Sequence, residues 1–188
     1  ANLSVGSVAI LSYAEKLYLL PVSIAITTYP VAAYPYIVDA LVDNKHDELW
    51  KLVKKTLSTS LFLGVVVGGV YFFMSDLIVQ VVYGMTSLGE GNLGGINSVI
   101  RGYIISIVLS GLILSMTNIL FALKKVKFIA LLSVVAVSVN ILGDLFVIRY
   151  YPKVENISLV TSITSVVYFS LASGFILIFF RARFKELY

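Results

Sequence analysis

Apolar residues along this chain of 188 residues come in five long runs, separated by polar or glycine-rich stretches. The runs cover approximately residues 5–37, 56–74, 99–123, 128–148 and 157–180. A helix needs about 20 mostly apolar residues to cross the hydrocarbon core of a bilayer. The pattern therefore predicts an all-α polytopic membrane protein, with five transmembrane helices in one transmembrane region that covers residues 1–188.

The first run differs from the others in its length and its prolines. As one helix, residues 5–38 would extend about 50 Å, whereas the hydrocarbon core is about 30 Å thick. Pro21, Pro30 and Pro35 lie inside it, and each proline removes a backbone donor and pushes away the carbonyl four residues earlier. We therefore expect a bend or an interruption between Leu17 and Pro35. Hydroxyl groups that could bond the freed carbonyls are present on Ser23, Thr27 and Thr28.

Two further stretches separate the first three runs. Residues 39–55 are largely polar, with apolar residues at helical spacing and with Trp50 among three lysines. This pattern is typical of an amphipathic helix at the headgroup level, so we expect an interfacial helix between the first two spans. Residues 75–97 contain five glycines, and we expect most of this stretch to be a loop.

Composition supports the membrane class and argues against several functions. Hydrophobic residues make up 59% of the chain and charged residues 13%, with a mean hydropathy of +0.98. In soluble domains about half of the residues are hydrophobic and about a quarter are charged. There is no cysteine and one histidine, His46, which argues against thiolate or histidine-built metal sites. No set of nucleophile, base and orienting group is present, so we do not expect an enzyme. Nor does the basic excess indicate a nucleic-acid partner, because in a membrane protein the location of charges matters more than their sum.

Basic residues are distributed unevenly among the connections. They are concentrated after the first and third spans and in the C-terminal tail, at Lys45, Lys51, Lys54, Lys55, Lys124, Lys125, Lys127, Arg181, Arg183 and Lys185. By the positive-inside rule these connections are cytoplasmic. We therefore expect a cytoplasmic C-terminus and an outside N-terminus. Because five spans with an outside N-terminus are unusual for a complete protein, we expect that at least one helix precedes this chain.

Two charged residues lie deep in the first predicted span. Glu15 and Lys16 are about eleven residues into it, which places them near the middle of the membrane. A charge there is costly unless it faces a bundle interior or a water-filled cavity, and such residues are commonly functional. The alternative is an ion pair that only fixes packing, or a lysine that snorkels to the interface. Neighbours in sequence point in different directions on a helix, so we do not expect Glu15 and Lys16 to pair with each other.

A second polar group lies in the fourth span. Asn140 and Asp144 are four residues apart and share one helix face. Thr161 and Ser158 on the next span are natural further oxygen donors. Oxygen ligands of this kind suit a hard cation. The alternatives are an Asn–Asp hydrogen bond that joins helices, and an aspartate that is hydrated near the outer headgroups.

The first span also carries a recognisable motif. Its residues Tyr13 to Leu17 read Tyr-Ala-Glu-Lys-Leu and are followed by Pro21 and Pro35. This arrangement resembles the Tyr-Ala-Asp-Arg-Leu…Pro…Leu-Pro signature that opens the second helix of the second lobe in the MurJ/MviN family of lipid II flippases. The polar segment from Asn44 to Glu48 continues the likeness. Similar hydropathy and loop order extend over nearly the whole chain.

This resemblance implies the location of the protein, its partners and the residues of its binding sites. It implies an incomplete second, C-terminal lobe, five helices of six, in the bacterial cytoplasmic membrane. Its partners would be a lipid-linked glycan, membrane lipids and the missing N-terminal lobe. Lys16 falls on the family's cavity arginine, which implies that it meets the pyrophosphate of the lipid carrier, with Glu15 and Tyr13 beside it in the substrate-binding site. The resemblance further implies a candidate sodium site, the one cofactor expected, at Asn140, Asp144 and Thr161.

The function implied is translocation of a polyprenyl-pyrophosphate-linked glycan, such as the peptidoglycan precursor lipid II, by alternating access. The chain departs from the family signature because Lys16 replaces arginine and Glu15 replaces aspartate. An ammonium cannot make the two-pronged contact with phosphate oxygens that a guanidinium makes. A flippase for another lipid-linked polysaccharide unit therefore stays open as an alternative. An ion-coupled multidrug exporter and a non-transporting membrane scaffold are the others.

Overall fold

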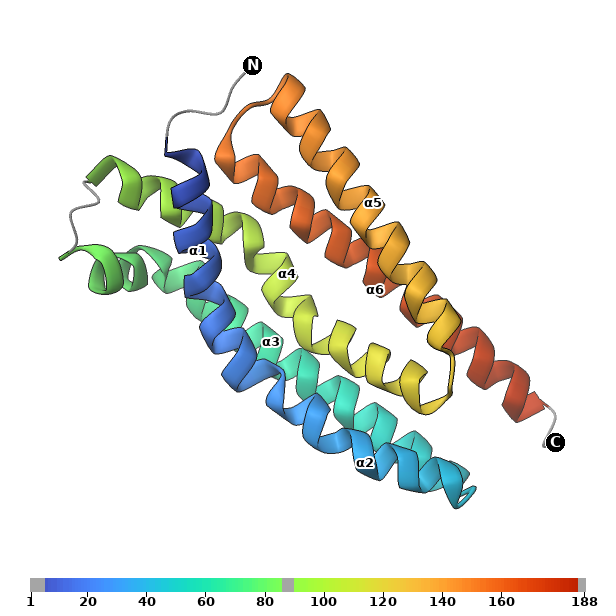
Figure 1. The fold of residues 1–188 in the computed structure, drawn as a ribbon. Coiled ribbons are helices and arrows are strands. Elements are labelled where there is room, and N and C mark those ends of the chain that lie inside the picture. Colours follow the sequence, from blue (N-terminus) through green and yellow to red (C-terminus); the bar gives the residue numbers. More distant parts are fainter. Residues whose placement is uncertain (1–5, 86–89, 186–188) are drawn as a thin grey trace.

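The computed structural model describes residues 6–85 and 90–185, and these residues form an all-helical bundle (Figure 1). Its elements are α1 (Ser7–Pro21), η1 (Val22–Ile26), α2 (Thr28–Val42), α3 (His46–Tyr83), α4 (Glu90–Ala122), α5 (Val126–Tyr150) and α6 (Val154–Lys185). Within the described residues, five helices are long and apolar enough to cross a membrane, when α1, η1 and α2 are counted as one. The all-α membrane class and the five spans are confirmed.

The first span is bent, as its prolines predict. A π-helical segment, η1, separates α1 from α2. Pro21 has no N–H to offer the carbonyl of Leu17, and the Tyr71 hydroxyl of α3 donates to that carbonyl over 2.7 Å. On the other side of the bend, the Asn118 amide of α4 donates to the Pro30 carbonyl over 3.0 Å. The hydroxyls of Ser23, Thr27 and Thr28 also donate to carbonyls within the bend. The acceptors are the carbonyls of Leu20, Ser23 and Ile24, and none of them lies four residues before a proline.

The expected interfacial helix is not a separate element among the described residues. Residues 39–42 complete α2, a short turn follows, and α3 begins at His46 and continues for 38 residues. The apolar face of the polar stretch packs inside the bundle, where Leu49 and Val53 are buried. The prediction of an interfacial helix was wrong, because an amphipathic pattern fits a bundle core as well as a bilayer surface.

The expected glycine loop is also mostly helical. α3 continues to Tyr83 and α4 begins at Glu90, while residues 86–89 lie outside the described part of the chain. At 38 residues, α3 is about 57 Å long and exceeds the thickness of a hydrocarbon core. Near this end, Arg101 of α4 forms an ion pair with Asp76 of α3 over 2.9 Å, and the Asn97 amide donates to the same carboxylate. These polar contacts link the two long helices.

The central helix is α4, which contacts all the other helices of the bundle. Its contact with α3 is close because α3 has glycine at residue 64, directly against the backbone of Val108. One turn before that glycine, the buried hydroxyls of Ser60 and Ser115 lie 2.8 Å apart and hydrogen-bond across the same contact. Small and hydroxyl-bearing residues commonly make such contacts between transmembrane helices.

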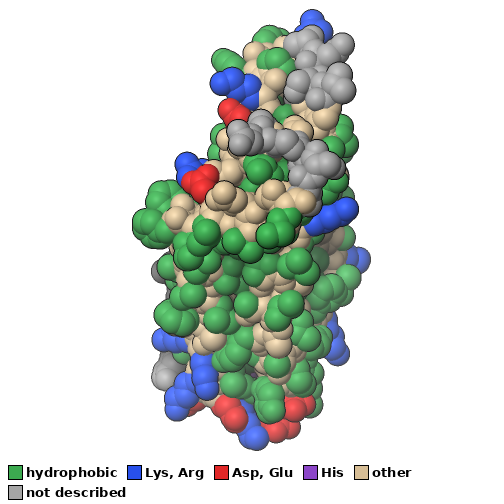
Figure 2. All heavy atoms as spheres, turned by 90° about the vertical axis from the view of Figure 1, so that its left-hand side faces the viewer, with side chains coloured by type: hydrophobic (Ala, Val, Ile, Leu, Met, Phe, Trp, Pro, Cys, Tyr) green, Lys and Arg blue, Asp and Glu red, His purple; other side chains and the backbone are tan. Residues whose placement is uncertain are grey.

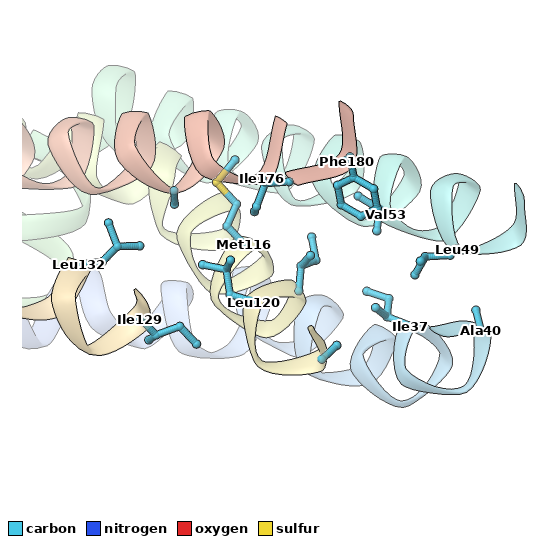
Figure 3. Packing of buried hydrophobic residues seen from close by; sticks show 13 residues of the cluster. Ile37, Ala40, Leu49, Val53, Met116, Leu120, Ile129, Leu132, Ile176 and Phe180 are labelled. Atoms are coloured by element: carbon cyan, nitrogen blue, oxygen red, sulfur yellow. The ribbon is translucent and has the colours of Figure 1, made fainter. Parts of the chain in front are cut away.

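One end of the bundle holds the α2–α3 and α4–α5 turns, and we call it the lysine-rich end because Lys45, Lys51, Lys54, Lys55, Lys124, Lys125 and Lys127 lie there. An apolar core cluster fills this end, including Ile37, Val53, Leu120 and Ile176 (Figure 3). The outside of the bundle is also apolar, and the Phe73 side chain is 83% exposed. Figure 2 shows hydrophobic side chains over most of one face, with charged groups mainly toward the two ends. Such a surface is suited to contact with lipid.

Candidate functional site

Lys16 lies on an exposed face of α1. It lines a hollow of about 620 Å³ whose other residues are Leu19, Leu20, Val22, Ser23 and Thr27. Lys16 is the one charged residue of this lining. Among the side chains that the structure describes, no acidic group forms an ion pair with Lys16, Glu15 included. The lining of the hollow is therefore largely apolar and includes one lysine, whose ammonium has no acidic partner among the described side chains.

Tyr13 supports the segment of α1 that carries Lys16. Its ring packs edge-on against the ring of Tyr83, with the two centroids 5.3 Å apart. The Tyr83 hydroxyl donates to the Tyr13 carbonyl over 3.1 Å, and the Lys16 ammonium lies 6.0 Å from the centre of the Tyr13 ring. The hydrogen bond from Tyr71 to Leu17 holds the next turn. Two tyrosines of α3 thus fix the orientation of α1 on both sides of Lys16.

Glu15 faces a different cavity from Lys16. This cavity, which we call the polar pocket, has a volume of about 440 Å³ and is lined by Glu15, Tyr18, Tyr103, Ile113, Ala136, Val137, Asn140, Thr161, Thr164, Ser165 and Tyr168. The Thr164 hydroxyl is enclosed and has no hydrogen-bond partner among the described residues. The structure therefore brings Glu15 together with Asn140 and Thr161 and separates it from Lys16.

The candidate ion ligands lie where α5 packs against α6. Asn140 and Thr161 both line the polar pocket. Asp144 is one turn beyond Asn140, and one of its carboxylate oxygens is buried without a hydrogen-bond partner in the described part of the chain. Gly143, beside Asp144, lies so close to Val160 that a Cβ atom there would be 2.5 Å from the valine side chain. Asp144 itself is not among the residues that line the polar pocket. An unpaired buried carboxylate oxygen one helical turn from an asparagine fits the chemistry of a hard cation.

Ser158, the other oxygen donor that the sequence suggests, faces a different helix. Its hydroxyl donates to the Glu155 carbonyl over 2.7 Å, and its side chain lies directly against Gly102 of α4. Ser158 is therefore not among the residues that line the polar pocket with Asn140 and Thr161, because its side chain packs against α4.

Several pocket residues were missed from the sequence. Tyr18, Tyr103 and Tyr168 line the polar pocket, although an aromatic belt at the membrane surface accounts for most tyrosines in such chains. The sequence does contain a signal for the wall of the polar pocket that α6 forms. The polar residues of α6 recur at the spacing of one helix face, at Thr161, Thr164, Ser165 and Tyr168.

Comparison with known proteins gives one match. A family model described as "Lipid II flippase MurJ" matches residues 1–183, which is nearly the whole chain. Neither the comparison with curated proteins nor the comparison with solved structures gave a match.

Proposed function

The chain belongs to the MurJ family of lipid II flippases, and from this premise we propose that it takes part in moving a polyprenyl-pyrophosphate-linked glycan across the cytoplasmic membrane. The family is one of lipid II flippases, which supports a role in peptidoglycan synthesis and in transport. The observation that carries the proposal is the position of Lys16 in the lining of the hollow beside α1 and η1, with no ion-pair partner among the described side chains.

The chemistry of this hollow suits a lipid-linked pyrophosphate. An ammonium group in a region of low dielectric constant attracts a phosphate much more strongly than it would in water. The leucines and valine beside Lys16 provide an apolar wall, against which the first part of a polyprenyl chain can lie. The same residues do not favour an exporter of cationic drugs, because the one charge in the lining is positive. A flippase for another lipid-linked polysaccharide unit would use the same contacts and remains the second candidate.

The proposal includes a sodium ion at the α5–α6 contact. Asn140, Asp144 and Thr161 would hold it through their side-chain oxygens, and the unpaired oxygen of Asp144 supports this assignment. A bound cation would supply positive charge that neutralises this partly buried carboxylate. Glu15 lines the same pocket, so its carboxylate would add to the attraction for cations there.

Substitution of Lys16 tests the proposal. We expect Lys16→Ala in the full-length protein to abolish complementation in bacteria depleted of their own lipid II flippase, and Lys16→Arg to retain it, because arginine keeps the charge. Lys153→Ala is the control, since Lys153 is an exposed lysine in the turn between α5 and α6 and lies 3.8 Å from the carboxylate of Glu155. Immunoblots of membranes confirm equal protein levels. Normal complementation by Lys16→Ala would contradict the role of Lys16 in headgroup binding.

A further inference from the structure

Five aromatic rings form a continuous row at the lysine-rich end. Trp50 of α3 lies 5.4 Å from Phe180 of α6, measured between ring centroids, and Phe180 lies 6.0 Å from Phe179. Phe179 lies 6.3 Å from Phe175, which stacks on Phe128 of α5 at 3.9 Å. We call these rings the aromatic row. Phe180 anchors it, because this side chain is buried and lies beside Val53 of α3 (Figure 3).

Two lysines lie over rings of this row. The ammonium of Lys54 is 4.9 Å from the centre of the Trp50 ring, and the ammonium of Lys125 is 5.1 Å from the centre of the Phe179 ring. Among the described side chains neither lysine forms an ion pair. Both charges are therefore available to an anion from outside the chain.

Lys45 at the same end shows the contrasting case. Its ammonium lies 3.0 Å from the carboxylate of Asp43 and 4.0 Å from that of Glu48. The hydrogen bond from Lys45 to Asp43 raises the pKa of Lys45 above its usual value. Lys45 is thus paired with acidic side chains, whereas Lys54 and Lys125 have no acidic partner in the described part of the chain.

The backbone adds a further attraction for anions. α5 begins at Val126, directly after Lys125, and no side chain caps its first N–H groups. The N-terminus of a helix carries a partial positive charge and uncapped N–H donors. Lys125 and this helix start therefore present positive charge together, next to the aromatic row.

We infer that the aromatic row, with Lys54 and Lys125, binds an anionic phospholipid of the leaflet at the lysine-rich end. The lysines and the start of α5 match a phosphodiester headgroup, and the rings match the glycerol region and the first part of the acyl chains. Aromatic side chains prefer this depth of the bilayer, and basic pockets between transmembrane helices on the cytoplasmic side recognise anionic headgroups. A free phosphate would use the lysines but not the rings. This inference does not depend on what the protein transports.

Trp50 gives a local readout, because it is the one tryptophan of the chain. The protein is reconstituted into vesicles of phosphatidylcholine that contain increasing fractions of phosphatidylglycerol brominated near the headgroup end of its chains. We expect this lipid to quench Trp50 fluorescence at a much lower mole fraction than equally brominated phosphatidylcholine does. In the variant Lys54→Gln/Lys125→Gln we expect the preference for phosphatidylglycerol to fall about 25-fold, since one lysine near an anionic surface contributes about five-fold in affinity.

The controls separate this site from general surface charge. Lys45→Gln should keep the wild-type preference, because Lys45 is already paired with Asp43. If the double variant does not fold, each single variant should show a loss of about five-fold. An unchanged preference in the lysine variants would overturn the inference, as would an equal loss in Lys45→Gln. Complete release of phosphatidylglycerol by a few millimolar inorganic phosphate would also overturn it, because the site would then recognise phosphate alone.

Discussion

Replacing Gly64 with alanine is expected to weaken the contact between α3 and α4. A Cβ atom at this position would lie 2.3 Å from the carbonyl oxygen of Val108 and 3.0 Å from its carbonyl carbon. Both atoms belong to the backbone of α4, so a change of side-chain rotamer cannot relieve the overlap. Normal contact distances are about 3.5 Å, and the two helices would have to separate by roughly 1 Å. Overpacking of this kind lowers the free energy of unfolding by about 1–3 kcal/mol.

Gly69→Ala provides the matched control on the same helix. A Cβ atom at Gly69 meets no other atom within 4 Å. Both substitutions raise the helix propensity of α3 by the same amount, about 1 kcal/mol in a helix interior, and this gain cancels when the two variants are compared. We therefore expect Gly64→Ala to be less stable than Gly69→Ala by about 1–3 kcal/mol. The difference isolates the contact with Val108.

The assay is reversible unfolding of the purified protein in mixed micelles with increasing sodium dodecyl sulfate, followed by circular dichroism. Wild type, Gly64→Ala and Gly69→Ala are measured at the same total detergent concentration, and each transition gives a free energy of unfolding. Equal free energies for the two variants would refute the assignment of Gly64 as a close-contact position. A result in which Gly69→Ala is the less stable of the two would refute it as well.

Two further substitutions test the bend and the candidate ion site. Tyr71→Phe should lower the free energy of unfolding by about 1–3 kcal/mol, because the buried Leu17 carbonyl loses its donor. In a Pro21→Ala background this loss should be smaller, because the new backbone N–H of residue 21 can donate to the same carbonyl. Equal losses in the two backgrounds would contradict this account. Sodium should raise the melting temperature of the wild-type protein relative to N-methylglucamine at equal ionic strength, and Asp144→Asn should remove that increase. A sodium effect of the same size in the variant would place the ion elsewhere.

The number of spans and the bend could be predicted because each depends on local physics. A long apolar run is sufficient to indicate a membrane helix. Prolines remove backbone donors wherever they occur in a helix, so the interruption near Pro21 follows from the sequence alone. The donor that replaces the missing N–H could not be predicted, because Tyr71 lies 54 residues away in the chain. Its position depends on how α3 packs against α1.

The helix boundaries were harder to predict from the sequence, because the same residue pattern is compatible with more than one structure. Lysines next to Trp50 are as favourable on the first turns of a transmembrane helix as on a helix at the surface. The glycines of residues 75–97 suggested a loop, yet Gly94 and Gly95 lie inside α4. A glycine in a helix costs about 1 kcal/mol, which packing in a long bundle can offset. Only the tertiary contacts decide between these solutions.

Glu15 and Lys16 show why the site itself could be predicted only in part. Their place along the first span follows from counting residues. Successive residues of a helix differ in direction by about 100°, so the two side chains line different cavities. Which cavity each one enters depends on the rotation of α1 about its axis, and the hydrogen bonds from Tyr71 and Tyr83 fix that rotation. α1 is consequently the element that the Lys16 hollow and the polar pocket share. Any tilt or rotation of α1 must move both the Glu15 carboxylate and the Lys16 ammonium. The position of Lys16, proposed to bind the headgroup, and the shape of the polar pocket, proposed to lie beside the ion, therefore cannot change independently.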